Sequence, residues 1–440
     1  MKTTPILTAL AIFASSTAMA AAGPTTVTPQ TATLYQNLTK QPAVTKALAN
    51  IKADDDWALA EMKTINAIPA PPFKEQARAA HLLTRFKELG LKDAYIDKEG
   101  NVLGVYKGAN PNGPLLVVSA HIDTVFPEGT DVVVKERDGK LHAPGIGDNT
   151  RGIVTLLAVI KAVHENKIKT AGSVMFAANV GEEGEGDLRG VKAIFRDHAN
   201  IAGFISIDSG DLENDVINQA TGSHRYEAIF TGPGGHSFAA FGKVPSAIHA
   251  MGRAIAKIAD LQTPADPKTT FTVGVVTGGA SINSIAGEAR MKLDMRSNGK
   301  EELLAVEKEA MAAIHAAVDE ENRRWNTQAK IAVELKPLGV RPAGLVPADS
   351  LIVQAAAASL NALGMSLKAL SAASTDSNVG ISLGIPSLTI GKGGISGAGH
   401  SLTEWYEHKD AYKGAQNALL LMLGLVGMDG AGKPLLEARK

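Results

Sequence analysis

Several short apolar runs in this chain end abruptly in histidine or acidic residues. The clearest spans residues 115–120 and leads directly into His121, with Asp123 two positions later. A near-continuous apolar run is typical of a strand that is buried on both faces, as in the parallel sheets of α/β proteins. Ligand-binding groups in such sheets gather at the carboxyl ends of the strands. The run therefore predicts a buried strand that presents His121 and Asp123 at such an edge.

Three further apolar runs have the same form. In chain order they are residues 173–180 before Glu182 and Glu183, residues 204–207 before Asp208, and residues 386–390 before the glycine-rich loop 391–399 and His400. Parallel strands end at a common edge of their sheet, so these side chains are expected to lie close together. The pattern predicts one site assembled from distant parts of the sequence.

Stretches with helical periodicity separate these runs. They lie near residues 73–89, 152–164, 351–363 and 411–425. Strands that alternate with helices are typical of an α/β fold with helices on the faces of the sheet. We therefore predict an α/β domain with a mixed, mainly parallel sheet.

A different order of elements occupies the segment between Asp208 and His400. The pattern there is strand, helix, strand, strand, helix, strand, at residues 225–230, 245–259, 271–276, 286–296, 300–324 and 330–335. This order is that of a ferredoxin-like α+β unit. We predict that residues 223–337 form an inserted domain, and that residues 34–222 and 338–440 together form the α/β domain.

Length and composition agree with two soluble domains. The chain has 440 residues, too many for one ordinary core, and 45% of them are hydrophobic while 20% are charged. The formal net charge of −1 provides no basic surface for nucleic acid or for an anionic membrane. Partners of those kinds are therefore not expected.

The N-terminus has the features of an export signal. Lys2 precedes an apolar stretch, and small residues around Met19 resemble a cleavage site near Ala20. We predict a signal peptide over residues 1–20, a disordered segment over 21–33, and a periplasmic or secreted protein. The apolar stretch is too short for a membrane anchor. The chain has no cysteine, so neither lipid attachment at a cysteine nor disulfides are expected.

One more acidic residue completes a candidate metal site. Asp148 lies in a glycine-rich loop that opens a helix, so the converging set contains two imidazoles and three carboxylates: His121, Asp148, Glu183, Asp208 and His400. Zn²⁺ accepts both kinds of ligand, with Mn²⁺ and Co²⁺ as alternatives. Five ligands exceed one tetrahedral site, but two ions can share them if one carboxylate bridges. The adjacent Glu182 is then available as a general base.

These motifs resemble the co-catalytic zinc exopeptidases and amidohydrolases, a family that includes carboxypeptidase G, peptidase T, aminoacylase and acetylornithine deacetylase. The resemblance spans nearly the whole chain after the signal peptide. It implies that Asp148 bridges two zinc ions, that Asp208 joins His121 on one ion, and that His400 joins Glu183 on the other. It further implies that Asp123 orients His121, that Glu182 is the general base, and that the peptide bond Asp148-Asn149 is cis.

In the resembled family, the inserted domain is a lid or dimerisation domain that also contacts substrate. The motifs Gly235-His236-Ser237, Asn283 after two glycines, and Asp294-Met295-Arg296 match its substrate-binding positions. The resemblance implies a homodimer in which His236 enters the site of the partner subunit. One departure is that Ala286 stands where many relatives have proline, close after Asn283.

The sequence leaves several functions to compare. A secreted metallo-exopeptidase acting on small peptides or N-acyl amino acids is favoured, since an aspartate at position 208 is usual in the peptidase branches of the resembled family. A deacylase of N-acyl amino acids is the alternative, and a non-catalytic binding module is the alternative of another class. Residues 380–384 formally fit a serine-nucleophile motif, but a helix is expected before them and a strand after them, the reverse of what that motif needs.

Overall fold

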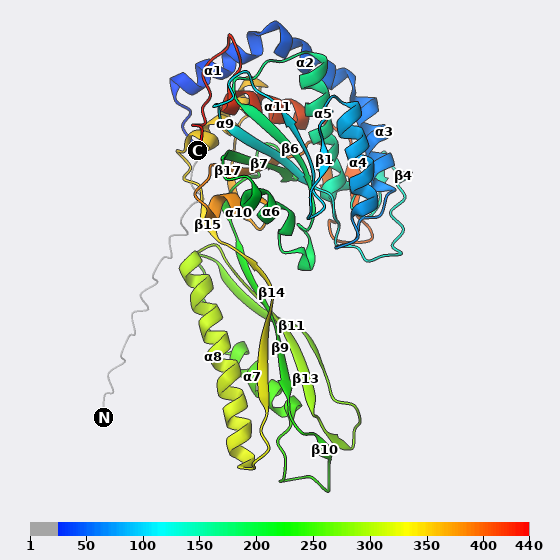
Figure 1. The fold of residues 1–440 in the computed structure, drawn as a ribbon, viewed down its shortest axis with the longest axis vertical. Helices are drawn as coiled ribbons and strands as arrows, with labels where there is room; N and C mark the ends of the chain where they lie inside the picture. The colour runs from blue at the N-terminus through cyan, green and yellow to red at the C-terminus, as the bar shows by residue number, and fades with distance from the viewer. Residues whose placement is uncertain (1–24, 440) are drawn as a thin grey trace, which may run out of the picture.

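The computed structural model describes residues 25–439. Two lobes are visible in Figure 1: a larger α/β lobe that contains the first and last parts of the described chain, and an elongated α+β lobe formed by its middle. The predicted signal peptide and its cleavage site near Ala20 lie outside the described residues. Among residues 25–439, no helix combines the length and the apolar character needed to cross a bilayer.

A nine-stranded mixed sheet forms the centre of the larger lobe. Its order is β1 (Tyr95–Ile96), β2 (Val102–Tyr106), β6 (Ser173–Asn179), β3 (Leu115–His121), β7 (Ile201–Ser209), β17 (Ser387–Gly391), β8 (Val216–Ala220) and β15 (Gly344–Leu345), with β16 (Leu370–Ala373) paired to β8. The four central strands β6, β3, β7 and β17 are parallel. These are the four strands expected from the apolar runs, and their carboxyl ends meet at one edge.

Helices cover both faces of this sheet. On one face lie α4 (Gln76–Glu88), α5 (Arg151–Glu165), α9 (Leu351–Ala362) and α11 (Tyr412–Val426), with α1 (Pro29–Lys40), α2 (Pro42–Ala53) and α3 (Asp55–Asn66) packed among them. On the other lie α6 (Arg189–Asp197) and α10 (Ser377–Ser382). In β3, Leu116 and Val118 join the first core while Leu115 and Val117 join the second. Burial on both faces explains why this strand has an almost uninterrupted apolar sequence.

The N-terminal segment corrects one prediction. Residues 21–33 were expected to be disordered, but in the described part of this segment, residues 25–33, α1 begins at Pro29 and Thr31 is buried. The side chain of Thr28 accepts a hydrogen bond from the backbone N–H of Thr31, and proline occupies the first turn of the helix. A threonine followed by proline is a helix-start signal. The alanine and threonine content of the segment obscured that signal.

The α+β lobe has the predicted ferredoxin-like order. Its elements are β9 (Gly222–Thr231), α7 (Ala247–Ala259), β11 (Thr269–Gly278), β13 (Glu288–Ser297), α8 (Lys300–Trp325) and β14 (Ala332–Arg341). The four strands are antiparallel in the order β11-β13-β9-β14, and both helices pack on one face to form a separate core. This lobe therefore has its own hydrophobic interior.

The last strand of this lobe is longer than the sequence indicated. It was expected to end at residue 335, close to Pro337, but β14 continues to Arg341. The strand lies at the edge of its sheet, and its pairing with β9 is irregular between Pro337 and Gly339. An edge strand tolerates proline, which lacks an N–H donor. The extension brings Arg341 to the larger lobe.

A second four-stranded sheet, which was not predicted, lies beside the edge of the main sheet. It has the order β18 (Ile395–Gly397), β19 (Trp405–Glu407), β5 (Lys140–His142) and β4 (Lys135–Arg137). The strands β18 and β19 flank His400, and β5 precedes the turn η1 (Ile146–Thr150) that contains Asp148. This small sheet therefore joins two segments of the candidate site.

Candidate metal centre

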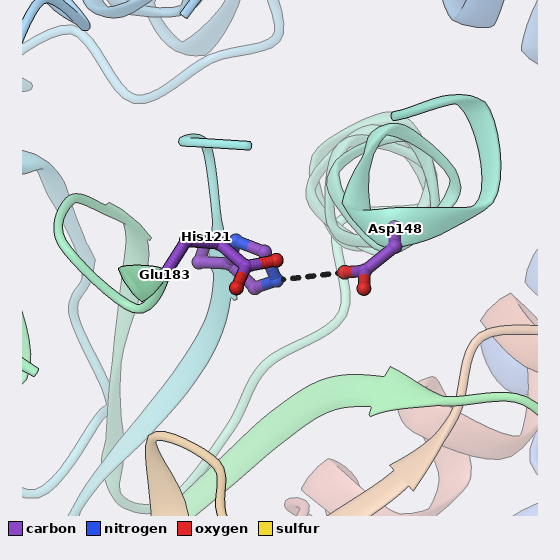
Figure 2. A group of neighbouring side chains, drawn as sticks. All are labelled: His121, Asp148 and Glu183. Carbon is purple, nitrogen blue, oxygen red and sulfur yellow. Dashed lines mark hydrogen bonds and ion pairs between the residues drawn. The ribbon is translucent and has the colours of Figure 1, made fainter. Parts of the chain in front are cut away.

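His121 is the last residue of β3, and its imidazole lies at the carboxyl edge of the central strands. The side chain is 1% exposed. Its Nε2 atom lies 3.1 Å from Oδ1 of Asp148, which comes from η1. Figure 2 shows His121, Asp148 and Glu183 gathered at this point from three separate segments. One ligand atom of each lies within 4.8 Å of the others, so the three residues could hold a metal ion.

His400 and Asp208 adjoin this cluster on either side. Nε2 of His400 lies 3.0 Å from Oδ2 of Asp148 and 3.1 Å from Oε1 of Glu183. Oδ1 of Asp208 lies 3.6 Å from Nε2 of His121. The structure thus brings together all five residues that the sequence suggested as ligands. Asp148 lies between the two histidines, with one carboxylate oxygen toward each.

The chemistry of these donors fits divalent cations. Two imidazoles and three carboxylates are the kind of set that binds zinc, manganese or cobalt. Hydrogen bonds from His400 to Asp148 and Glu183 raise the pKa of His400 to about 10. The same contacts place both acids beside the imidazole with which they could share a cation.

Asp123 is fully buried behind His121, and its carboxylate has further partners besides this histidine. Nδ1 of His121 lies 3.1 Å from the backbone oxygen of Asp123 and 3.7 Å from its Oδ1. The carboxylate also accepts hydrogen bonds from the backbone N–H groups of Glu182, at 3.2 Å, and Glu183, at 2.8 Å. Asp123 therefore connects His121 to the Glu182-Glu183 pair, which sequence reasoning had not anticipated.

Glu182 lies next to the cluster and is 6% exposed. Burial raises the pKa of its carboxyl group well above the usual range, although the charge of Arg341 opposes this shift. Nη1 of Arg341 donates to Oε1 of Glu182 at 3.0 Å, and Nη2 donates to the backbone oxygen of the same residue. Arg341 could not be predicted from the sequence, because it belongs to no recognisable motif and is separated from Glu182 by 159 positions.

Two other buried charged groups adjoin the cluster. Nζ of Lys392 lies 3.4 Å from Oδ1 of Asp208. Asp376 accepts a hydrogen bond from Nδ2 of Asn179 at 2.7 Å, and burial raises the pKa of Asp376 to about 7. The sequence placed Lys392 and Asp376 near the site but supplied no motif for a role.

The three substrate-binding residues suggested by the resemblance are divided between two places. His236 is in β10 (Gly235–His236), which pairs with β12 (Ser284–Ile285) beside Asn283. Both side chains are exposed, and β10 lies at the end of the α+β lobe that is remote from the larger lobe (Figure 1). Arg296 is in β13, where its Nε donates to Oδ2 of Asp294 at 2.8 Å. Within a single chain, His236 and Asn283 do not join the metal cluster.

The serine-nucleophile alternative has the wrong local structure. Ser382 is the last residue of α10, a helix that precedes the strand β17. Its hydroxyl group donates to the backbone oxygen of Val379 at 2.8 Å. A nucleophile elbow requires a strand, a sharp turn and then a helix. Ser382 is therefore part of a helix end.

The peptide bond between Asp148 and Asn149 is cis, as the resemblance implied. A family model described as peptidase family M20/M25/M40 matches residues 117–423, a range that contains all five candidate ligands. The match also covers the whole α+β lobe.

Two curated proteins are similar to parts of the chain. A putative [LysW]-lysine/[LysW]-ornithine hydrolase of Pyrococcus abyssi is 34% identical over 125 residues, which are 28% of this chain and 32% of the relative. Carboxypeptidase G2 of a Pseudomonas species is 26% identical over 215 residues, which are 47% of this chain and 49% of the relative. The chain thus matches about a third to a half of the length of these relatives.

The chain is also similar to solved structures of the same fold, and here the similarity extends over almost the whole length of each solved protein. A tripeptidase from Staphylococcus aureus is 22% identical with a TM-score of 0.68, over 83% of this chain and 97% of that protein. The Bacillus subtilis YXEP protein, a dinuclear metal-binding peptidase, is 17% identical with a TM-score of 0.62, over 85% of this chain and 99% of that protein. These similarities confirm the predicted fold class.

Proposed function

The chain belongs to peptidase family M20/M25/M40, and from this membership we propose that it is a metal-dependent hydrolase of amide bonds in small peptides or N-acyl amino acids. The observation that carries the proposal is the meeting of His121, Asp148 and Glu183 within 4.8 Å, with Glu182 beside them. A cluster of metal-binding side chains next to a buried carboxylate is what metal-assisted hydrolysis requires.

We propose that the site holds two divalent ions, most simply zinc. His121 and Asp208 would hold one ion and Glu183 and His400 the other, while Asp148, which contacts both histidines, would be shared between them. When bound, two such ions would polarise a scissile carbonyl and lower the pKa of the attacking water toward about 7. The dinuclear metal binding of the Bacillus subtilis relative supports this number.

Glu182 is the proposed general base. It accepts a proton from the attacking water and returns it to the leaving amine. Burial raises its pKa above the ordinary glutamate value, which suits a group that must both take up and release a proton. Arg341 holds the carboxylate in place through Oε1 and the backbone. Asp123 accepts hydrogen bonds from the backbone N–H groups of Glu182 and Glu183 and so holds the backbone of both residues in place.

The test of the base is the substitution Glu182→Gln, which keeps the shape of the side chain and removes its basicity. We expect turnover to fall by at least about 10²-fold, while two equivalents of metal stay bound. Glu185→Gln is the matched control, because Glu185 is in the same loop, is exposed and pairs with Lys292 on the α+β lobe. Turnover retained in Glu182→Gln would show that another group removes the proton.

Substrate binding is proposed to need a second copy of the chain. Arg296 and Asn283 would bind the terminal carboxylate of the substrate, and His236 of the partner subunit would stabilise the oxyanion. The exposed position of His236, remote from the cluster of its own chain, supports a role in the site of another chain. We therefore propose a homodimer formed through the α+β lobe.

The substrate class can be decided with a small panel. The relatives include a carboxypeptidase, a hydrolase and a tripeptidase, so both peptides and other amides need testing. We propose peptides first, and deacylation of N-acyl amino acids as the second candidate. Comparing di- and tripeptides with free and blocked ends against N-acyl amino acids identifies the end that is recognised. No hydrolysis of any member, with no bound metal, would favour a non-catalytic binding protein.

The proposed location is the periplasm or the medium, on the basis of residues 1–20 alone. Fractionation of cells that express the full chain, followed by N-terminal sequencing of the product, tests this. A mature protein that begins near Ala21 outside the cytoplasm is expected. A cytoplasmic product that retains Met1 would contradict the proposed export.

A further inference from the structure

Glu404 is a buried acid that no part of the proposed mechanism uses. Its side chain is 1% exposed. Within residues 25–439, no lysine or arginine nitrogen lies within ion-pair distance of its carboxylate. An ionised carboxylate placed so deeply requires hydrogen bonds to balance the loss of water. Those bonds come from the backbone of one short segment.

The partners of Glu404 are the N–H groups of the loop that contains Asp148. Oε2 accepts from Gly145 at 2.9 Å, and Oε1 accepts from Gly147 at 2.8 Å and from Asp148 itself at 2.9 Å. The backbone oxygen of Glu404 also accepts from Ala143 at 3.2 Å. One residue therefore holds the backbone of segment 143–148 at four points.

The glycine content of this loop follows from the same contacts. Gly145 has a φ of 79°, in the left-handed region that favours glycine. A Cβ atom on Gly147 would lie 3.2 Å from Oε1 of Glu404 and 2.7 Å from Cβ of Ser396. The loop thus lacks side chains where the Glu404 carboxylate approaches its backbone. This close approach is what permits three N–H groups to reach one carboxylate.

The position of Glu404 in the chain connects the two halves of the cluster. It lies four residues after His400 and directly before β19, while its carboxylate binds the loop of Asp148. His400 and Asp148 contact each other at 3.0 Å. Glu404 belongs to the same chain segment as His400, and its carboxylate is hydrogen-bonded to the backbone of Asp148. It therefore sets the distance between His400 and Asp148.

We propose that Glu404 is a positioning residue for the metal centre, which fixes Asp148 relative to His400 and thereby sets metal affinity. This inference rests on the proposed function, since it assigns Asp148 and His400 to a shared ion. Glu404 does not contact metal or substrate in this arrangement. It acts through its hydrogen bonds to the backbone of the loop that contains Asp148.

The substitution Glu404→Gln tests the role, because it keeps the volume but places an N–H₂ group against at least one N–H donor. We expect the Kd for at least one of two zinc ions to rise about 10- to 100-fold, as is usual when groups behind metal ligands are lost. The measurement is zinc titration of metal-free protein in competition with a chromophoric chelator. The unfolding temperature of the metal-free variant is measured in parallel.

The matched control is Glu407→Gln, three residues further along, where the glutamate is partly exposed and its nearest cation is Lys140 at 4.0 Å. This variant should bind zinc as the unchanged protein does. If Glu404→Gln does not fold, Glu404→Asp, which keeps the charge but shortens the reach, is judged by the same criterion.

Zinc affinity equal to that of the unchanged protein, with only a lower unfolding temperature, would overturn the inference and leave Glu404 a structural residue. Failure of the unchanged protein to bind two ions would instead overturn the proposed function. The two failures are therefore distinguishable.

Discussion

The guanidinium group of Arg341 binds Glu182 at two points, one on the side chain and one on the backbone. Nη1 also donates to the hydroxyl group of Ser374 at 3.2 Å. Arginine can do this because its donors form a rigid, planar fork. At the scale of single residues, the general base is thus held by a side chain that comes from the end of β14. Its orientation depends on where the α+β lobe meets the larger lobe.

This contact leads to a prediction for Arg341→Lys. Lysine keeps the charge but has one ammonium group, which cannot reach both oxygens in the same geometry. We expect kcat/KM to fall about tenfold, a part of the 10²- to 10⁴-fold that a positioned base contributes, with metal content unchanged. Arg196→Lys is the control, because Arg196 is exposed and pairs with its neighbour Asp197. Steady-state kinetics and metal analysis check both variants. Wild-type kinetics in Arg341→Lys would mean that charge alone suffices.

At the scale of elements, the two helices of the α+β lobe are joined by one buried acid. Glu321 of α8 is fully buried and accepts hydrogen bonds from the backbone of Ser246 at 3.2 Å, Nε1 of Trp325 at 2.7 Å and Nε of Arg253 at 3.1 Å. Ser246 caps α7, and Arg253 belongs to it. Burial alone would raise the pKa of Glu321, but these bonds outweigh it and the pKa is lowered.

The lowered pKa determines how Glu321 affects stability with pH. Since the folded-state pKa lies below the unfolded one, the stabilisation is present above the ordinary glutamate pKa of about 4.3 and is lost as the pH falls through the folded value. Glu321→Gln should therefore lower the free energy of unfolding by about 1 to 3 kcal/mol at pH 7. The difference from the unchanged protein should shrink below about pH 4.

Urea unfolding at pH 7 and near pH 3.5 measures both quantities. Glu309→Gln, on the exposed side of the same helix, is the control and should have little effect at either pH. A difference between Glu321→Gln and the unchanged protein that stays constant with pH would contradict the assignment of the effect to an ionised Glu321.

At the scale of the whole molecule, the two lobes have separate cores and are joined by polar contacts. Across the junction, Arg341 and Arg225 reach the loop after β6, where Arg225 donates to the backbone oxygen of Gly184 at 2.5 Å. The far end of the α+β lobe, with β10 and β12, stands apart from the larger lobe (Figure 1). The edge strand β11 also exposes Val275 and Val276. This shape suits a lobe that contacts a second chain.

The proposed exchange of His236 between chains predicts complementation. His236→Ala and Glu182→Gln should each be nearly inactive, with a loss of about 10²-fold or more. Mixed after unfolding and refolding together, about half of the dimers would contain one of each, and each mixed dimer would have one complete site. The mixture should therefore recover about a quarter of the wild-type activity. Activity assays across mixing ratios check this.

For the control, the two variants are refolded separately and combined just before the assay, so that mixed dimers have no time to form. This control should stay nearly inactive. An inactive mixture that nevertheless contains mixed dimers would show that His236 does not act in the partner's site. Full activity of His236→Ala alone would show that it has no role in turnover.

The four parallel strands at the centre of the nine-stranded sheet could be predicted because their pattern is local. A strand buried on both faces needs consecutive apolar residues, so β3, β6, β7 and β17 are visible in the sequence. The strand-end rule then placed four of the five candidate ligands together without knowledge of any contact, and the glycine-rich loop before a helix supplied Asp148. The helices α1 to α3 and the strands of the small sheet were missed. They lack this pattern, since α2 has only three buried residues and β4 has none.

The sequence by itself determined the central strands and the kinds of side chain that lie at their carboxyl ends. It could do so because hydrophobic periodicity is a property of neighbouring residues, and because parallel strands end at the same edge of a sheet. Only the tertiary structure decided what holds that chemistry in place. The contacts from Arg341 to Glu182 and from Glu404 to Gly145 join residues 159 and 259 positions apart. Such contacts depend on how whole lobes and sheets pack, and a single buried charge leaves no periodic signal in its own neighbourhood.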